Sequence, residues 1–476
     1  ISGNISGSLN ISYPGLSPSS KLTLSGSNNF IGRLSILVGT LVAGSTTAFG
    51  AENNTIELGS RNSSIDLNGQ SMGSYQLNIQ GEGAGNQGVV PPSFPGALTN
   101  SSASSASIAG TITVVGDRPA YIGGSAAGTL SLSQAIIKDN GQGIGFIGNM
   151  NILAANPLNE ISTIAGSAAS LNLVSRYGLT VGIVQDLSGL SINGANAGLR
   201  LYGLSGGVVV NKSISAVSDI YVFGQGNNTN QNGVVINAGA SSVTSTQGSV
   251  NLIGVTSFNG YGVYIGPGIK LTTQSNSNGS ISISGSNTCS GDCYGSGVYI
   301  DGDVSSNYTV LKAGTSLNIA GHANGNALHD VYGIRTLPYS LLISGSDMEL
   351  GGSTPRGNSA TGYTTNGSAG YAIYLGGTTL SSGGKLNIEG VSPASNYDVG
   401  NTISANGVAV LVVGSAANGA NQAGVYIGAP GSVLAYGGTS YSNIVAAGNI
   451  WIAGSSNSDT NYAFHGVWDE ASIISN

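Results

Sequence analysis

The residues best suited to chemistry are acidic and lie close together in the sequence. Asp292, Asp301 and Asp303 are followed by Lys312. Glycosidases use two carboxyl groups held roughly 5–9.5 Å apart, whereas carboxylates with a basic residue could instead hold Ca²⁺ for a polysaccharide lyase. An Asp-Gly-Asp triplet is also a common turn sequence, so this single pair does not by itself establish either chemistry.

The histidines do not form a familiar metal-binding or catalytic motif. His322, His329 and Asp330 could together suggest a metal site, but no His-x-x-x-His spacing occurs and His465 is distant in sequence. The signature patterns of polygalacturonases are missing, with Gly-His-Ala at 321–323 the nearest approach. No Gly-x-Ser-x-Gly nucleophile motif lies between a predicted strand and a helix. The sequence therefore predicts no metal site, no cofactor and no enzyme activity.

The two cysteines predict a local disulfide. Cys289 and Cys293 are the only cysteines of the chain. A structural zinc site needs four ligands, and a thioredoxin-like motif has two residues between its cysteines rather than three. A disulfide that closes the tip of a loop fits the spacing, and it would place the chain in an oxidising, extracellular environment.

The elements that must carry these residues are visible as short apolar phrases that return at intervals of tens of residues. Apolar residues alternate within each phrase, which places Val263 and Ile265 on one face of a strand and Tyr264 on the other. One such unit cannot bury its own apolar face, but a stack of units buries a continuous core. The phrase Gly-Val-Tyr-Ile stands at 262–265, 297–300 and 424–427, and a second phrase stands at 249–254 (SVNLIG), 280–285 (SISISG), 316–321 (SLNIAG), 385–390 (KLNIEG) and 449–454 (NIWIAG).

These repeats predict an all-β fold, a right-handed parallel β-helix (solenoid) with loop insertions, in preference to a β-sandwich. We expect residues 1–260 to form a β-helix with shorter coils and a Pro/Ser-rich surface loop near 89–107. Residues 261–476 should continue it with units of about 35 residues and longer, Tyr-rich loops. The longest of these predicted loops are 347–370 and 391–404.

The composition excludes several classes of protein. The chain has 78 glycines, only 7% charged residues and a net charge of −7. Disordered chains combine low hydrophobicity with high net charge, whereas 40% of this chain is hydrophobic. The 13 Lys and Arg residues are scattered singly, which argues against nucleic acid as a partner. No apolar run is long enough for a transmembrane span.

Tyrosine is unevenly distributed, with six of the 21 residues before position 239 and fifteen after it. Tyrosine offers a large amphipathic contact area and is enriched at recognition surfaces. For the tyrosines predicted within strands, such as Tyr264 and Tyr299, we favour stacking of like residues in adjacent coils. The tyrosines predicted in loops are candidates for contact with a ligand, and these are Tyr294, Tyr332, Tyr339, Tyr363 and Tyr397.

With the phrases SLNIAG, SISISG and GVYIG in place, the chain resembles the filamentous-haemagglutinin-like exoproteins that bacteria export by two-partner secretion. The resemblance runs through nearly the whole chain and lies in the style of the repeat rather than in identity to one member. The Asn-Pro-Asn motif of the family's secretion domain has only a partial counterpart in NPLN at 156–159. We therefore expect an excised segment of a larger protein, downstream of that domain.

The resemblance implies a secreted or cell-surface rod, exterior to the outer membrane, that reaches its location through an outer-membrane transporter. Its implied partner is a glycan or protein on a host cell, a bacterial cell or a biofilm. Two alternatives remain open at this point. The chain could be a carbohydrate-active β-helix enzyme that uses Asp301 and Asp303, or the passive stalk of a contact-dependent toxin exoprotein.

Overall fold

The computed structural model describes most of the chain, in two compact units. The described residues are 1–85, 95–124, 128–148, 150–185, 187–194, 198–274, 279–289, 295–302, 307–324, 331–337, 339–353, 370–376, 378–391, 396–399, 402–405, 409–417, 423–428, 443–446, 449–457, 465–469 and 472–475. Unit 1 comprises residues 1–204 and 211–218, and unit 2 comprises residues 205–210 and 219–476.

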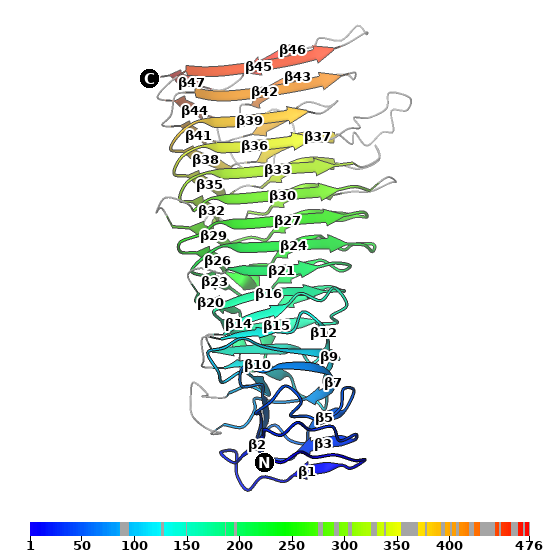
Figure 1. Ribbon diagram of the computed structural model, residues 1–476. Helices are drawn as coiled ribbons and strands as arrows, with labels where there is room; N and C mark the ends of the chain where they lie inside the picture. The colour runs from blue at the N-terminus through cyan, green and yellow to red at the C-terminus, as the bar shows by residue number, and fades with distance from the viewer. Residues whose placement is uncertain are drawn as a thin grey trace. The chain divides into compact units, whose positions relative to one another are not determined.

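Unit 1 contains two ladders of short parallel strands (Figure 1). The first ladder consists of β1 (Ile11–Tyr13), β3 (Arg33–Ile36), β5 (Thr55–Leu58), β7 (Ser71–Ile79), β9 (Ala106–Val114), β11 (Thr129–Ser131), β12 (Ala135–Lys138), β14 (Asn151–Ala154), β16 (Ser170–Ser175) and β21 (Leu199–Gly203). The second consists of β2 (Lys21–Leu24), β4 (Gly39–Ala43), β6 (Ser63–Asp66), β8 (Leu98–Thr99), β10 (Ala120–Gly124), β13 (Ile144–Gly148), β15 (Thr163–Ala168), β17 (Leu179–Val181), β20 (Leu190–Ile192) and β23 (Ile214–Ala216). An antiparallel hairpin of β18 (Ile183–Val184) and β19 (Leu187–Ser188) is added to them.

The coils of unit 1 are short and their strands are in register. Ile11 aligns with Leu34, Leu34 with Ile56, and Ile56 with Leu77. The chain therefore advances by 23, 22 and 21 residues per coil over this stretch. Because side chains alternate along a strand, this register stacks the buried side chains of Leu34, Ile56 and Leu77 on one another and produces a continuous core.

Aromatic side chains fill the interior of unit 1. Phe30, Phe49 and Tyr75 are all buried, and the rings of Phe49 and Tyr75 pack edge to face with their centroids 5.8 Å apart. The Tyr75 hydroxyl donates a hydrogen bond to the carbonyl of Gly50 at 3.0 Å, so this polar group is satisfied inside the core. The buried Asn54 amide donates to the carbonyls of Phe30 and Phe49, which secures the turns that deliver both rings. The core is thus wide enough to hold rings at its centre.

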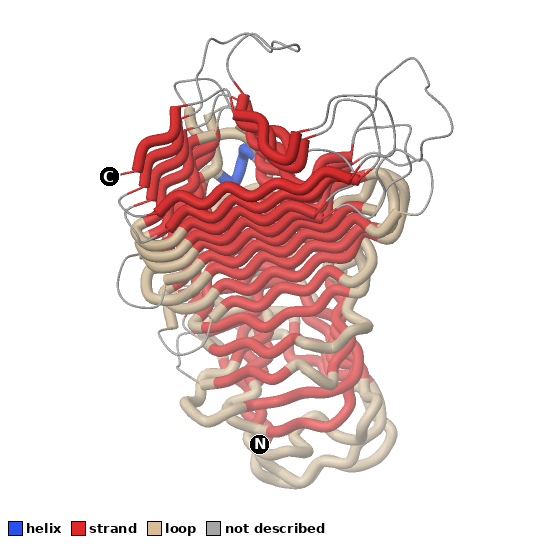
Figure 2. Tube along the Cα trace, turned by 90° about the horizontal axis from the view of Figure 1, so that it is seen from above, coloured by secondary structure: helices blue, strands red, loops and turns tan. Residues whose placement is uncertain are grey.

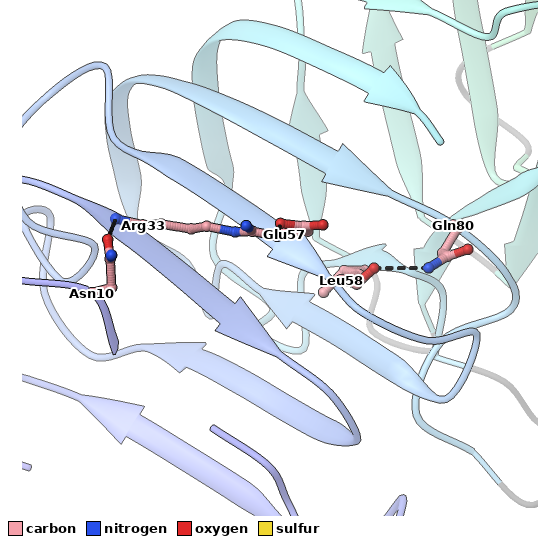
Figure 3. A network of polar contacts seen from close by, with 5 residues as sticks. All are labelled: Asn10, Arg33, Glu57, Leu58 and Gln80. Atoms are coloured by element: carbon pink, nitrogen blue, oxygen red, sulfur yellow. Dashed lines mark hydrogen bonds and ion pairs between the residues drawn. The ribbon is translucent and has the colours of Figure 1, made fainter. Parts of the chain in front are cut away.

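The outer surface of unit 1 carries polar contacts between neighbouring coils (Figure 3). The Arg33 backbone N–H donates to the Asn10 side-chain oxygen, and the Arg33 guanidinium forms an ion pair with Glu57. The Gln80 amide donates to the carbonyl of Leu58 at 2.9 Å. Both members of the ion pair are partly exposed, and exposed pairs of this kind contribute only about 0–1 kcal/mol.

Unit 2 is a parallel β-helix with three strands per coil, because each strand pairs with the third strand after it. Face I contains β24 (Ile220–Gly226), β27 (Val250–Thr256), β30 (Ile281–Asn287), β33 (Leu317–Ala323), β36 (Met348–Ser353), β39 (Leu386–Val391), β42 (Ala409–Ala417) and β45 (Asn449–Asn457). Face II contains β22 (Val208–Val210), β25 (Val234–Ile236), β28 (Gly260–Ile265), β31 (Gly295–Ile300), β34 (Val331–Thr336), β37 (Gly370–Gly376), β40 (Asn396–Val399), β43 (Ala423–Gly428) and β46 (His465–Asp469). Face III contains β26 (Ser242–Ser245), β29 (Lys270–Thr273), β32 (Thr309–Ala313), β35 (Ser340–Ser344), β38 (Thr379–Ser382), β41 (Thr402–Ala405), β44 (Asn443–Ala446) and β47 (Ser472–Ser475).

The strands of unit 2 keep their register although the coils differ in length. A 3₁₀ turn, η1 (Ala238–Ala240), joins β25 to β26. On face I, Val250 aligns with Ile281, Ile281 with Leu317, and Leu317 with Met348, so that successive coils advance by 31, 36 and 31 residues. Figure 2 shows the strands of successive coils stacked as parallel zigzags. Extra residues are therefore accommodated in the turns and not in the ladders.

The two repeated phrases of unit 2 meet backbone to backbone. Gly254 and Gly285 occupy equivalent positions on face I, and Gly262 and Gly297 occupy equivalent positions on face II. A Cβ atom on Gly254 would overlap the carbonyl of Gly262, and one on Gly285 would overlap the carbonyl of Gly297. Each phrase contains glycine because faces I and II approach too closely there for any side chain.

The predicted all-β, parallel β-helix is confirmed, and the alternation read from the sequence is correct in detail. Val263 and Ile265 are fully buried while Tyr264 lies on the outer side. In the SLNIAG phrase, Leu317 and Ile319 are buried and Asn318 is exposed. The change of repeat style predicted near residue 261 does not coincide with the boundary between the two compact units, which lies near residues 205–219.

Three predicted loops contain strands. Within 89–107, Leu98 is buried and pairs with both Ile65 and Ile122, because β8 continues the second ladder of unit 1. The loop predicted at 347–370 begins with β36, and that at 391–404 contains β40 and most of β41. In each case the need for every coil to supply a strand to its ladder outweighs a local sequence rich in small and polar residues. Residues 89–94, 354–369, 392–395 and 400–401 of these loops lie outside the described residues.

Candidate functional site

The structure separates the five tyrosines predicted to contact a ligand. Tyr332 lies in β34 and Tyr397 in β40, so neither is in a loop, because each continues the ladder of face II. Tyr339 does lie in a turn, between β34 and β35. Tyr294 and Tyr363 lie outside the described residues. The prediction of loop positions is therefore wrong for Tyr332 and Tyr397 and correct for Tyr339.

The strands of face II bring together tyrosines that are scattered in sequence. The paired positions in β28 and β31 skip Gly262 and Gly297, which interrupts the period-two alternation at those glycines. As a result Tyr261 and Tyr264, three residues apart, both lie on the outer side, although Val263 between them is buried. Tyr264 aligns directly with Tyr299 of the next coil. We call Tyr261, Tyr264, Tyr299, Tyr332 and Arg335 the aromatic ladder.

The rings of the aromatic ladder contact one another. The centroid of the Tyr261 ring lies 5.5 Å from that of Tyr264 and 4.8 Å from that of Tyr299, and Tyr264 and Tyr299 are 5.5 Å apart. The Tyr261 and Tyr264 rings are nearly parallel, at 23°, and the other two pairs are tilted. These distances are typical of favourable aromatic pairs. The predicted stacking of like residues in adjacent coils is thus confirmed for Tyr264 and Tyr299.

An arginine takes the tyrosine position in the next coil. Arg335 aligns with Tyr299, and its guanidinium carbon lies 5.2 Å from the Tyr299 ring centroid and 4.6 Å from that of Tyr332. Both distances are within the range of cation–π attraction. Tyr332 is buried while Tyr261, Tyr264, Tyr299 and Arg335 are half-buried. The cation is therefore held between two rings at the surface and does not extend into solvent.

The backbone register extends the same column beyond Arg335. Arg335 aligns with Tyr374, Tyr374 with Tyr397, Tyr397 with Tyr426, and Tyr426 with Trp468. Seven successive coils thus place an aromatic residue or arginine at one position of face II, counting from Tyr264. The parallel ladder turns a sequence repeat into a linear array.

Burial and the Asp301 carboxylate raise the pKa of two phenols of the ladder, Tyr264 and Tyr299. The Tyr264 hydroxyl donates a hydrogen bond to the Asp301 carboxylate at 2.9 Å. Burial first, and then this hydrogen bond and the Asp301 charge, raise the pKa of Tyr264 well above its usual value. Burial and the Asp301 charge raise the pKa of Tyr299 to about 12, against the opposing influence of Arg335. Both phenols are neutral at physiological pH, and because the Tyr264 O–H is donated to Asp301, the Tyr264 oxygen remains available to a partner as an acceptor.

The predicted acidic cluster is represented in the structure by Asp301 alone. Its carboxylate accepts the Tyr264 hydroxyl, whereas Asp292 and Asp303 lie outside the described residues, so no carboxylate pair is defined. Lys312 is exposed in β32. Among the described residues, no group of three or more His, Cys, Asp and Glu side chains could hold a metal ion.

The predicted histidine and cysteine sites are only partly described. His322 lies in β33, not in a loop, and its Nδ1 is 2.8 Å from the Ser353 hydroxyl at a shallow hollow on face I. His329 and Asp330 lie outside the described residues. Cys289 is buried and disulfide-bonded. Its predicted partner, Cys293, lies outside the described residues, so that pairing stays a prediction.

Sequence reasoning did not select most of the aromatic ladder as a site. Tyr261 and Arg335 were not singled out, because the interruption at Gly262 and the neighbouring-coil alignment are invisible in a single phrase. The signal that could have found them is the recurrence of Tyr two residues after the phrase glycine, at Tyr264, Tyr299 and Tyr426. Aligning the remaining coils on that glycine places Arg335 in the same column.

Comparison with known proteins gives no match: no family model, no curated protein and no solved structure is similar to the chain. None of the helices in the described part of the chain is long and apolar enough to cross a membrane.

Proposed function

We propose that the chain is a segment of a secreted bacterial surface adhesin, and that the aromatic ladder of unit 2 contacts a glycan or protein on a neighbouring surface. The observation that carries this proposal is the in-register column of half-buried rings and one arginine on face II. Tyrosine and arginine are the residue types most enriched in interface hot spots. An extended parallel array offers the same contact in coil after coil, which suits attachment to a repeating polymer or a dense surface.

The packing of the ladder favours binding with little loss of conformational entropy. Each ring is already held by its neighbours, at centroid distances of 4.8–5.5 Å, and Tyr264 is also held by its hydrogen bond to Asp301. Side chains that are ordered before binding do not lose rotamer freedom on contact, which improves affinity. The half-buried surface leaves ring edges and hydroxyls accessible to a partner.

The proposal is tested with the full chain on a glycan array and on whole bacterial and host cells, with release of soluble sugar followed in the same wells. The double variant Tyr264→Ala, Tyr299→Ala should reduce binding at least tenfold, because two hot-spot side chains are removed. Tyr177→Ala in unit 1 is the matched control, since that tyrosine is half exposed and lies outside the ladder.

Three results would overturn the proposal. Wild-type chain that binds no glycan and no cell would favour a passive stalk. Binding that both the ladder variant and the Tyr177→Ala control retain would place the contact elsewhere. Sugar release that disappears in Asp301→Asn would indicate the enzyme. Thermal melting of each variant distinguishes loss of the ladder from loss of the fold.

A further inference from the structure

A second group of exposed aromatic residues lies in the turns that connect face II to face III. Tyr339, in the turn before β35, has φ of 66° and is 38% exposed. A bulky residue with positive φ is a rare outlier, and Gly or Asn would adopt this conformation with less strain. Such strain concentrates at functional sites. Tyr339 therefore has a ring at a position where the backbone alone favours a smaller residue.

The ring of Tyr339 is paired with that of Tyr308 from the preceding coil. Their centroids are 5.7 Å apart and the rings are nearly perpendicular, at 87°. Tyr308 is 42% exposed, and the Thr309 N–H donates to the Tyr339 carbonyl at 3.1 Å, which ties the two turns together. Two large aromatic surfaces are thus presented to solvent on a fixed frame.

Tyr308 and Tyr339 occupy equivalent positions in successive coils, and the equivalent position one coil before Tyr308 borders a hollow. Lys270 aligns with Val310, so Gly268 occupies the position of Tyr308 in that coil and contributes no side chain. A hollow of about 500 Å³ lies there, and its walls include Ser241, Ser242, Lys270 and Asn307. This volume falls within the range of small-molecule sites, which combine a few polar groups with apolar surface.

The polar wall of the hollow carries a positive charge. The Lys270 side chain is exposed, and in the described part of the chain no carboxylate forms an ion pair with it. The chain as a whole has a net charge of −7, so Lys270 gives this hollow a charge opposite to that of the chain. At a surface, charge attraction acts over roughly 10 Å or less in 0.1 M salt. Lys270 therefore attracts anionic groups that lie in or close to the hollow.

We propose that this corner of unit 2 binds an acidic saccharide. The acidic sugar residue occupies the hollow, where its carboxylate pairs with the Lys270 ammonium and its hydroxyls bond to Asn307 and the two serines. The adjoining sugar residue of the saccharide packs against Tyr308 and Tyr339 of the next two coils. The aromatic pair contributes apolar contact, and the polar residues of the hollow orient the sugar and pair with its charge. The corner site shares no residue with the aromatic ladder, so it stands or falls separately from the proposed function.

The test is calorimetric titration of the full chain with trigalacturonic acid, 3′-sialyllactose and neutral maltotriose. Saturable binding of at least one acidic sugar, with maltotriose at least tenfold weaker, is the expected result. The two acidic probes distinguish a uronic acid from a sialic acid as the preferred source of the carboxylate. Absence of binding by both acidic sugars, or equal binding of maltotriose, overturns the proposal.

Variants assign the binding to the corner. Lys270→Gln and Tyr308→Ala should each weaken binding of the acidic sugar about tenfold or more, since a charge-assisted contact or an aromatic surface is lost. Tyr339→Asn removes the ring but suits the positive φ, so it should lose affinity without losing thermal stability. Lys312→Gln, an exposed lysine of β32, is the matched charge control.

Two results would place the sugar elsewhere. Equal losses of affinity for the acidic sugar in Lys312→Gln and Lys270→Gln would show that binding depends on the overall surface charge and not on Lys270 in particular. Loss of acidic-sugar binding in the ladder variant Tyr264→Ala, Tyr299→Ala, with Lys270→Gln unaffected, would move the acidic-sugar site to the aromatic ladder. If that ladder variant loses cell binding but keeps acidic-sugar binding, both sites are supported.

Discussion

The two units place their main aromatic clusters differently. In unit 1, Phe30, Phe49 and Tyr75 lie inside the coils. In unit 2, Tyr264 and Tyr299 lie on the outer side of face II. Their neighbours along each strand are aliphatic residues that point into the core. A ring inside a coil contributes to stability through burial, whereas a ring on the outside remains available for contact. The internal rings of unit 1 thus contribute to its stability, whereas the external rings of unit 2 form the surface that we propose contacts a partner.

Different local contacts accompany this contrast. Faces I and II of unit 2 touch through glycine backbones, as at Gly254 with Gly262 and Gly285 with Gly297, and the space beside them suits Val, Ile and Leu. In unit 1 the buried Asn54 amide bonds to the carbonyls of Phe30 and Phe49 and so holds the turns from which both rings enter the core.

The largest effect that tests the contrast is expected from Phe49→Ala in unit 1. Removal of a buried ring leaves a cavity and should lower the free energy of unfolding by about 3–5 kcal/mol. Phe258→Ala in unit 2, where the ring is 40% exposed, is the control and should change it by less than about 1 kcal/mol. Urea unfolding followed by circular dichroism measures both. Equal losses would show that unit 1 does not depend on its internal rings.

A smaller but sharper effect is expected from Gly285→Ala in unit 2. The added methyl group would overlap the Gly297 carbonyl, and overpacking of this kind lowers the free energy of unfolding by about 1–3 kcal/mol. Gly351→Ala on the same face is the control, because nothing lies within 4 Å of its added Cβ atom. Melting temperatures report the difference. If both variants were equally stable, the close approach of faces I and II would be refuted.

The smallest effect concerns Tyr75→Phe and its dependence on pH. At neutral pH the variant should be less stable by about 1 kcal/mol, because the buried hydrogen bond to the Gly50 carbonyl is lost. Burial, and secondly the Glu52 charge, raise the pKa of Tyr75 to about 12, above the unfolded value of 10.0. The stabilisation by the neutral phenol is therefore complete below pH 10 and is lost as the pH rises towards 12.

The variant has no phenol at position 75, so its deficit relative to the wild type should shrink between pH 10 and 12. The pH-dependent losses from Tyr264 and Tyr299 of unit 2 are common to both proteins and cancel in the comparison. Urea unfolding at a series of pH values measures the deficit. A constant deficit across this window would mean that Tyr75 is not shielded from solvent.

The architecture could be predicted from the sequence because period-two alternation and phrase return are both local signals. Val263, Ile265, Leu317 and Ile319 are buried as expected. The candidate site could be predicted only in part, because it depends on alignment between coils. Tyr332 looks like a loop residue in isolation, and only the pairing of Ser296 with Tyr332 shows that it belongs to face II.

The interruption at Gly262 marks a limit of pattern reading. Strict alternation from Val263 back to Tyr261 would bury Tyr261, yet its ring lies outside against Tyr264 and Tyr299. The cause is the approach of the Gly262 backbone to face I, which shifts the phase of the strand by one residue. A contact with another strand therefore overrides the local pattern, and no single-strand argument could anticipate it.

The paired glycines also have a consequence for how such a chain can change over generations. The pairs occupy the same place in successive coils, and coils that advance by 31 or 36 residues keep the same strand alignment. A recombination that joins one glycine phrase to the equivalent phrase of another coil would still encode a complete coil. The gene can then lengthen or shorten by whole coils, and turns such as the one bearing Tyr339 can be exchanged while the ladders stay intact.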